Sequence, residues 1–324
     1  MKTSFLKDLE SLKLGEPATY KNMTLFPLQG KSNISSDYHC FGEHLTNGNV
    51  AVEEIGEGEV SALRVTNNTG KPILIPDGII LKGGFQTRTT DHSTMVDPHQ
   101  SIVIATSCVE QGRWSVGMTS TDFDIAASMM FSKGRADKVS TLKESLRSGG
   151  EARASQDRIW SSVSDKFRNM DAYSSTDSLD EMNNAFRDRT EGFAKAYATE
   201  EMDKGIIYAC NDRIIGADIF DKSSTLACYF PNLIRGVAMD CIEYGSTGRR
   251  PVQSQAEDFF SQLLKSDIRS FEGSGSGENY ELDSPRIDAL LLIYKGRVIH
   301  CIAFSIASHV GTSHSRFSSR RRHN

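Results

Sequence analysis

Two short polar runs in the first third of the chain combine side chains that bind anions with side chains that perform catalysis. In the first run, Lys82, Gln86 and Arg88 fall at even-numbered positions, with glycines at positions 83 and 84. Side chains repeat every two residues along an extended chain, so we expect these three on one face. An ammonium, an amide and a guanidinium beside glycine suit a phosphate or a carboxylate.

The second run, residues 107–114, follows an apolar segment and places a thiol close to a carboxylate. Cys108 and Glu110 are the catalytic candidates, because a thiolate is a strong nucleophile once a cationic neighbour lowers its pKa. His92 and His99 are the nearest candidate bases outside the run. The candidate ligand-binding residues of the two runs are Lys82, Gln86, Arg88, Gln111, Arg113 and Trp114.

The two runs are open to three interpretations. In the first interpretation, the runs form a buried network that fixes a turn of a sheet, with Glu110 paired to Arg88 or Arg113 and Cys108 as a small core residue. In the second, they line a ligand site, in which Trp114 offers a stacking face. In the third interpretation Cys108 acts as a catalytic nucleophile.

The elements that position these runs predict an α+β fold. Residues 1–114 are a β-rich part, sandwich- or barrel-like, because short apolar runs alternate with turn clusters about every ten residues after a leader arm at 1–17. Residues 115–205 read as a helical region, in which Ser178 is a candidate N-cap. Residues 206–305 read as a mixed α/β part, and we expect one integrated domain to residue 305.

Two hairpins are expected in the mixed part, at 205–220 and at 289–304, separated by helices at 225–244 and 253–268. The sequence from Ile207 to Ile215 is similar to that from Leu291 to Ile299. Either an internal duplication or chance would explain this similarity. The Gly/Ser-rich stretch 271–279 reads as a flexible loop, and residues 306–324 as a disordered, Arg-rich tail.

Composition excludes several classes of protein. The chain of 324 residues is 38% hydrophobic with a net charge of −5, which does not indicate a nucleic-acid or membrane partner. It lacks a signal-type leader and a bilayer-length apolar run, so a cytoplasmic location is expected. Its six cysteines are widely spaced, and neither they nor the histidines show metal-ligand spacing. Asp218 and Asp221 would suit a metal, although Asp221 also reads as a helix N-cap.

Several motifs together resemble a poorly characterised bacterial family whose name describes association with ADP-ribosylglycohydrolase and rhodanese/phosphatase genes. The resemblance rests on the 107–114 run, on Asp77-Gly78 and Lys82-Gly83, and on Gln86 and Arg88. Weaker matches are Leu14-Gly15-Glu16-Pro17, Gln156, Trp160, Gly216-x-Asp218-x-Phe220 and Gly296-Arg297-Val298-x-His300. The chain departs from the family pattern at Gly84-Phe85.

The resemblance implies a role near NAD or ADP-ribose metabolism. We therefore expect a protein that binds or processes a phosphate-bearing nucleotide of the NAD or ADP-ribose type, with no cofactor specified. The alternative is a non-enzymatic interaction or scaffold module in which the polar runs are structural.

Overall fold

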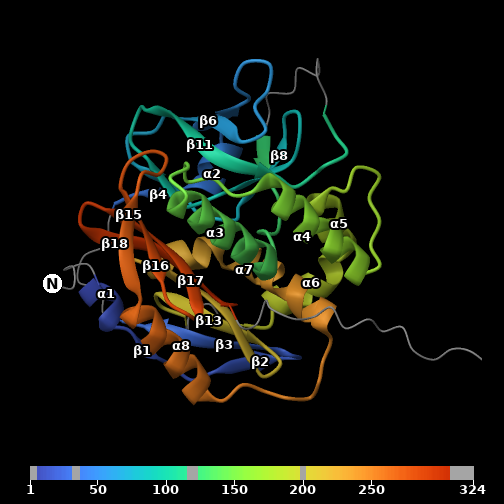
Figure 1. Ribbon diagram of the computed structural model, residues 1–324, viewed down its shortest axis with the longest axis vertical. Coiled ribbons are helices and arrows are strands. Elements are labelled where there is room, and N and C mark those ends of the chain that lie inside the picture. The colour runs from blue at the N-terminus through green and yellow to red at the C-terminus, as the bar shows by residue number, and fades with distance from the viewer. Residues whose placement is uncertain (1–5, 31–36, 115–122, 198–201, 307–324) are drawn as a thin grey trace, which may run out of the picture.

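An antiparallel sheet of nine strands forms the base of the molecule and takes its strands from both ends of the chain (Figure 1). The computed structural model describes residues 6–30, 37–114, 123–197 and 202–306. The strands, in order across the sheet, are β1 (Lys13–Leu14), β3 (Met23–Gln29), β13 (Gly205–Cys210), β14 (Arg213–Phe220), β18 (Arg297–Ser305), β17 (Ile287–Tyr294), β16 (Glu278–Asp283) and β15 (Asp267–Phe271), with β2 (Ala18–Tyr20) paired to β3.

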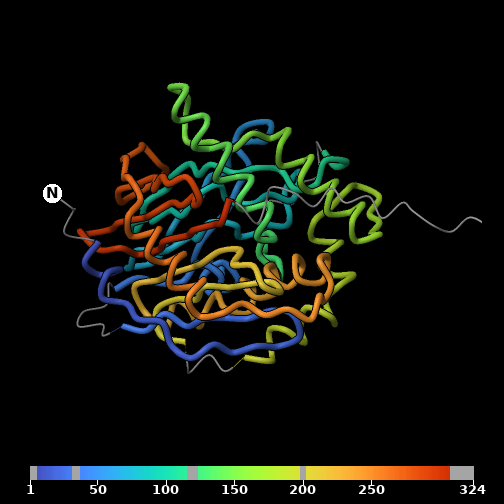
Figure 2. The backbone as a smooth tube through the Cα atoms, turned by 60° about the horizontal axis from the view of Figure 1, so that its bottom comes forward, coloured from blue at the N-terminus to red at the C-terminus, as the bar shows by residue number. Residues whose placement is uncertain are grey.

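Both faces of this sheet are buried along its central strands β13, β14, β18 and β17. On β13, Tyr208 belongs to one apolar cluster, whereas its neighbours Ile207 and Ala209 belong to another, as the two-residue period of a strand requires. Helices α3 (Ser132–Arg147) and α7 (Ser223–Tyr244) cover the first face. Helices α1 (Leu6–Glu10) and α8 (Gln253–Lys265) cover the second. Figure 2 shows the blue N-terminal strands beside the yellow β13–β14 hairpin.

The two expected hairpins are confirmed, and they are neighbours related by an approximate two-fold axis. Each has a register shift at the same place, after Tyr208 in β13 and after Leu292 in β17. Strands β14 and β18 pair Gly216 with Phe304 and Phe220 with His300. Gly216 corresponds to His300 and Phe220 to Phe304 in the aligned hairpins, so the pairing is symmetric, as an internal repeat would give.

The chain between β3 and β13 contains the β-rich N-terminal half and the helical middle. A six-stranded sheet has the order β12 (Phe123–Ile125), β8 (Ile80–Gly83), β9 (Arg88–Thr90), β11 (Ser101–Cys108), β6 (Ala62–Asn67) and β5 (Val50–Glu53). A three-stranded sheet of β10 (Thr94–Val96), β7 (Ile73–Ile75) and β4 (His39–Cys40) lies against it, and α2 (Phe41–Thr46) packs nearby. The prediction of an α+β fold with a β-rich N-terminal half is confirmed.

The helical middle consists of α3, α4 (Gln156–Asn169), α5 (Leu179–Ala185) and α6 (Arg187–Ala194). Helix α4 buries Ile159, Val163 and Phe167, which lie four residues apart and form an apolar stripe on one face. Ser178 caps α5, since its hydroxyl accepts a hydrogen bond from the backbone N–H of Glu181 at 3.4 Å. None of the helices formed by the described residues combines the length and the apolarity needed to cross a membrane.

Some local expectations are wrong. Within the leader arm, Leu6 and Leu9 are buried on α1 and β1 joins the large sheet, because the apolar side chains there have a partner in α8. Asp221 is not the N-cap of α7; the cap position is Lys222, and the carboxylate of Asp221 accepts a hydrogen bond from the Tyr38 hydroxyl. The tail from residue 307, like residues 1–5 of the arm, lies outside the described residues.

Candidate functional site

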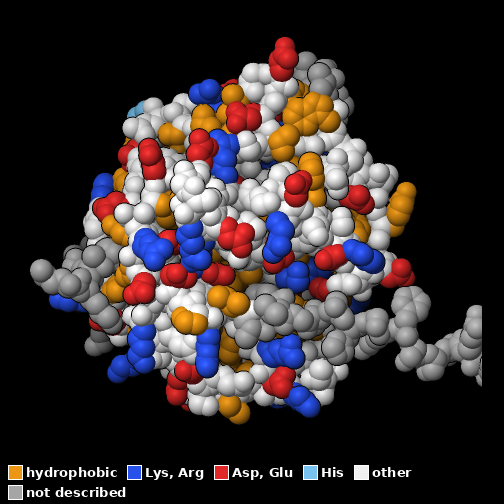
Figure 3. All heavy atoms as spheres, viewed as in Figure 1, with side chains coloured by type: hydrophobic (Ala, Val, Ile, Leu, Met, Phe, Trp, Pro, Cys, Tyr) orange, Lys and Arg blue, Asp and Glu red, His pale blue; other side chains and the backbone are white. Residues whose placement is uncertain are grey.

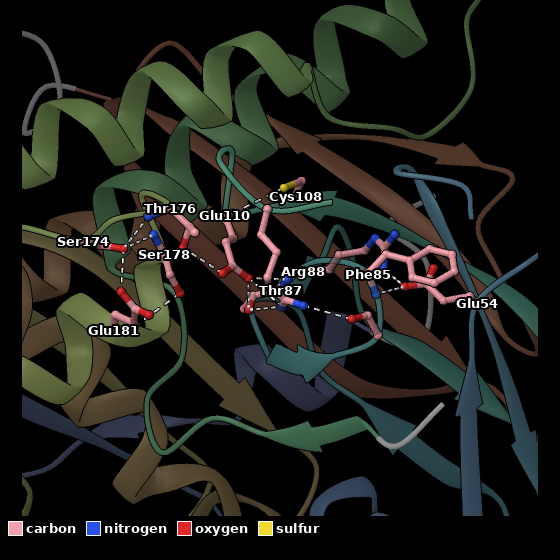
Figure 4. Close-up of polar contacts among 12 residues, drawn as sticks. Glu54, Phe85, Thr87, Arg88, Cys108, Glu110, Ser174, Thr176, Ser178 and Glu181 are labelled. Atoms are coloured by element: carbon pink, nitrogen blue, oxygen red, sulfur yellow. Dashed lines mark hydrogen bonds and ion pairs between the residues drawn. The ribbon is translucent and has the colours of Figure 1, made fainter. Parts of the chain in front are cut away.

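The carboxylate of Glu110 lies at the centre of a hydrogen-bonded cluster that joins three segments (Figure 4). Its Oε2 accepts hydrogen bonds from the backbone N–H and the hydroxyl of Thr87, at 3.0 and 2.7 Å, and pairs with Arg113 Nη2 at 2.7 Å. Its Oε1 accepts from the Thr176 hydroxyl at 2.9 Å. Burial alone would raise the pKa of Glu110, but the hydrogen bonds from Arg113 and Thr87 outweigh it and hold this pKa below its usual value.

The backbone after β11 is tied to the start of α5, which holds Glu110 in place. Leu179 N–H donates to Val109 C=O at 3.0 Å, and Gly112 N–H donates to Thr176 C=O at 2.8 Å. Gly112 allows this approach, because a Cβ there would lie 2.8 Å from Thr176 Cα. The 107–114 run is therefore a fixed turn.

Arg88 forms a second ion pair, in which its own side chain is fully buried and that of its partner nearly so. Its Nη1 lies 2.7 Å from Glu54 Oε1, with side-chain exposures of 0% for Arg88 and 8% for Glu54. The same carboxylate oxygen accepts the backbone N–H of Phe85 at 2.7 Å. Arg88 Nε also donates to Val60 C=O at 3.2 Å. This pair joins the β8–β9 turn to the segment after β5.

Cys108 is buried at the end of β11 and is held by its backbone. The side-chain amide of Gln156 bonds both backbone groups of Cys108, accepting from its N–H at 2.8 Å and donating to its C=O at 2.9 Å. The Cys108 thiol accepts the Glu110 N–H at 3.3 Å. Burial raises the pKa of Cys108, which disfavours the thiolate that nucleophilic catalysis needs.

An exposed rim borders the buried pairs. We use "rim" for Lys82, Phe85, Gln111, Arg113 and Trp114. The side chains of Lys82 and Arg113 are 43% and 28% exposed to solvent, and Trp114 is 40% exposed. Phe85 and Trp114 pack with their ring centroids 5.5 Å apart. Arg113 Nη1 donates to Gly84 C=O at 2.9 Å, which joins the two polar runs.

The structure thus divides the predicted site residues into two groups. Gln86, Arg88, Cys108 and Glu110 are buried, whereas Lys82, Gln111, Arg113 and Trp114 are open or partly open. The predicted single face of Lys82, Gln86 and Arg88 is wrong, because the chain turns at Gly83 and Gly84, which have φ values of 126° and 51°. Leu81 instead pairs with Arg88 across this turn.

A further buried charge cluster, which the sequence did not reveal, surrounds Arg135 of α3. Asp77, Asp218 and His300, three residues of the motifs quoted above, meet there. Lys138, one turn along α3, contacts Asp77 Oδ1 at 2.6 Å. A basic residue on a helix is ordinarily expected to face solvent, so the sequence did not predict that Arg135 and Lys138 are buried. The carboxylate of Asp218, which the sequence also suggested as a metal ligand, binds Arg135. The described residues contain no group of acidic, histidine and cysteine side chains suited to a metal.

Figure 3 shows acidic and basic side chains intermixed over the face that it presents, with no field of one sign.

Comparison with known proteins gives one result. The model of a family described as the ARG and Rhodanese-Phosphatase-superfamily-associated Protein domain matches residues 11–304. No curated protein and no solved structure matches the chain.

Proposed function

The chain belongs to this family of ARG and Rhodanese-Phosphatase-superfamily-associated Protein domains, and we propose that it binds a phosphate-bearing nucleotide related to NAD or ADP-ribose at the rim. The motifs on which the family resemblance rests supply Lys82, Gln111, Arg113 and Trp114. Their chemistry fits such a ligand: a guanidinium for phosphate, an amide for sugar or base, and an indole for stacking. Lys82, whose ammonium lies 3.2 Å from the exposed Asp124 carboxylate, would add a second cation.

Arg113 and Trp114 both contact the Gly84–Phe85 segment, the guanidinium through the Gly84 carbonyl and the indole through the Phe85 ring, and this arrangement carries the proposal. Glu110 binds Nη2 of this guanidinium and the Gly84 carbonyl binds Nη1, while the side chain remains 28% exposed. An arginine whose conformation is already fixed loses little rotamer freedom when it binds an anion. Phe85 fixes the Trp114 ring in the same way. The groups that would bind the phosphate and the base of a nucleotide, Arg113 and Trp114, would therefore already be held in position before binding.

Catalysis by Cys108 and Glu110 remains a prediction within this function. The thiol is buried and its pKa is raised, and Glu110 already accepts hydrogen bonds from Thr87 and Thr176. Chemistry at these residues would require the turn at 108–114 to open.

A cytoplasmic location is proposed as well. It is supported by the free thiols of all six cysteines, which are Cys40, Cys108, Cys210, Cys228, Cys241 and Cys301.

Isothermal titration of the full chain with ADP-ribose and with NAD tests the binding function. Arg113→Ala should weaken the binding of either nucleotide at least tenfold, which corresponds to about 1.4 kcal/mol. Trp114→Phe should weaken it less, because a smaller ring remains. Arg158→Ala, on the exposed side of α4, is the matched control and should leave affinity unchanged. Absence of saturable heat at millimolar ligand from a folded sample, or equal affinity of the Arg113 variant, would contradict the proposal.

The second candidate function, a non-enzymatic scaffold module, is supported by the buried Glu54–Arg88 pair. Arg88→Ala would leave the Glu54 carboxylate buried without its cation, which costs about 3–5 kcal/mol. A scaffold therefore predicts a large fall in melting temperature, or dissociation of oligomers, for Arg88→Ala and a fall for Lys82→Ala, while no nucleotide binds the wild-type chain. Saturable nucleotide binding that Arg113→Ala abolishes would decide against it.

A further inference from the structure

A cleft of about 740 Å³ lies on another part of the molecule and shares no residue with the rim. Its walls are the edge of β11, the loop that follows α3, and β15 with the loop at 271–274. Val103 and Phe271 contribute apolar surface, and Val103 is 43% exposed. A cleft of about 300–1,000 Å³ with apolar walls and a few polar groups is typical of small-molecule sites.

His92 lines this cleft with an unused hydrogen-bond donor. The ring is 3% exposed, and its Nε2 accepts the backbone N–H of Ser274 at 3.0 Å. Burial lowers the pKa of His92 to about 4, so the ring is neutral at neutral pH. With Nε2 as acceptor, the single ring proton resides on Nδ1. Nδ1 is buried and has no hydrogen-bond partner within the described part of the chain.

Glu281 of β16 supplies an unused acceptor in the same cleft. Its residue exposure is 4%, and its Oε2 is buried without a hydrogen-bond partner among residues 6–30, 37–114, 123–197 and 202–306. The other oxygen, Oε1, lies 3.8 Å from Arg269 Nη1, beyond hydrogen-bonding distance. Buried polar atoms are almost always paired, so an unpaired donor and an unpaired acceptor in one cleft indicate a ligand with hydroxyl groups.

Three arginines line the cleft together with three carboxylates, those of Glu151, Glu272 and Glu281. Arg147 pairs with Asp283 at 2.9 Å, and Arg153 pairs with Glu151 at 2.7 Å. Each guanidinium has five N–H donors, so these pairs leave donors for an anion. Arg269 is the least engaged, since its guanidinium lies 3.8 Å from the Glu281 carboxylate oxygen, and its side chain is 59% exposed.

The Gly/Ser-rich stretch that the sequence presents as a flexible loop is fixed against the cleft. Besides the bond to His92, the Ser274 hydroxyl accepts the Ala105 N–H at 3.2 Å. Ser276 N–H donates to Met95 C=O at 2.8 Å. Gly275 has a φ of 72°, and a Cβ there would lie 2.3 Å from Met95 C=O. The loop therefore forms a preorganised wall that β10 and β11 hold.

We propose that this cleft binds a small sugar phosphate. The Glu281 carboxylate accepts hydrogen bonds from sugar hydroxyls, and His92 Nδ1–H donates to a sugar oxygen. Arg269, with Arg147 and Arg153 beside it, binds the phosphate, while Val103 and Phe271 contact the apolar face of the sugar. This site is independent of the nucleotide function proposed for the rim, because the two surfaces have no residue in common.

Titration calorimetry of the full chain with ribose 5-phosphate, ribose and inorganic phosphate tests the site. We expect saturable binding of ribose 5-phosphate that is at least tenfold tighter than that of either fragment. Arg269→Ala removes an exposed side chain but also the cation nearest the buried Glu281 carboxylate. Once this variant is shown to be folded, it should weaken ribose 5-phosphate at least tenfold. Glu281→Gln should weaken ribose 5-phosphate at least fivefold and leave inorganic phosphate within twofold.

Arg158→Ala is again the matched control, and circular dichroism checks that each variant is folded. No saturable binding of ribose 5-phosphate by the wild-type chain at millimolar concentration would overturn the proposal. So would an affinity that Arg269→Ala leaves intact, or inorganic phosphate binding as tightly as the sugar phosphate. Nucleotide binding at the rim would stand or fall separately, because it depends on Arg113.

Discussion

Asp77 and Asp218 share one guanidinium, that of Arg135. Arg135 Nε lies 2.8 Å from Asp77 Oδ2, while its Nη1 and Nη2 bind both oxygens of Asp218 at 3.0 and 2.7 Å. All three side chains are buried. Asp77 precedes β8 and Asp218 lies in β14, so this cluster joins the β-rich N-terminal half to the nine-stranded sheet through α3. Removing any one charge would leave another buried without its counter-charge.

Gly78 provides the space for this arginine, which makes it a specific test of the cluster. Its φ is 78°, and a Cβ there would lie 2.7 Å from Arg135 Nε. Gly149 has a nearly identical φ of 79°, with nothing within 4 Å of a Cβ. Gly149→Ala should therefore cost only the left-handed backbone, about 1 kcal/mol. Gly78→Ala should cost about 3 kcal/mol or more, since Arg135 must also move.

Urea unfolding of the two glycine variants beside the wild-type chain gives the comparison. The difference between their losses of unfolding free energy isolates the contact with Arg135, because the backbone term is common to both. Equal losses would show that Arg135 can adjust without losing its carboxylates.

The pH dependence of stability should separate His92 from Asp218. Burial lowers the pKa of His92 from 6.5 to about 4, with Asp77 and Lys138 nearby acting in opposite directions. Between these pH values the unfolded chain binds the proton and the folded chain does not, so stability falls as pH falls. The loss should reach about 3 kcal/mol by pH 4, at 1.36 kcal/mol per pKa unit.

Asp218 acts in a lower pH window. Burial would raise its pKa, but Arg135 and His300 hold it well below its usual value of 3.8. Its contribution to stability is present above pH 4 and is lost only as pH falls further. Urea unfolding at pH 7, 5.5 and 4.5 should therefore show a slope that His92→Gln largely removes. A slope unchanged in this variant would assign the pH dependence to other groups.

The hairpins and most helices could be predicted because their signals are local. Asn211 and Lys295 adopt φ values of 54° and 53° in tight turns, between strands whose apolar residues are continuous. The stripe of α4 and the cap at Ser178 have equally local causes. Such elements depend on neighbours within a few residues, which a single sequence displays.

The joining of distant segments could not be predicted from the same evidence. Strand β3 pairs with β13 across the whole β-rich and helical part, and no local pattern encodes that partner. Arg135 and Lys143 of α3 look like solvent-facing residues, yet both are buried by carboxylates from remote strands. In the polar runs, the Glu110–Arg113 pair is one of the two pairings that the sequence left open, but the alternation failed at Gly83 and Gly84. Glu54, which pairs with Arg88, lay outside either motif.

Thiol labelling distinguishes the structural role of Cys108 from the catalytic one. Cys108 is fully buried and its pKa is raised, and the Glu110 N–H hydrogen bond engages its sulfur. Cys228 is exposed on α7, while Cys40 is partly buried with its pKa lowered through its contacts with Cys228 and Lys222. The hydrogen bond between Cys40 and Cys228 raises the pKa of Cys228, which leaves exposure as its only advantage. Iodoacetamide should therefore modify Cys40 first, Cys228 next, and Cys108 only on unfolding. Peptide mass spectrometry over a time course in the native state, with a urea-unfolded sample as control, measures the order. A Cys108 that reacts faster than the other five would mean that the turn at 108–114 opens readily, and the thiol-enzyme interpretation would then gain over the structural one.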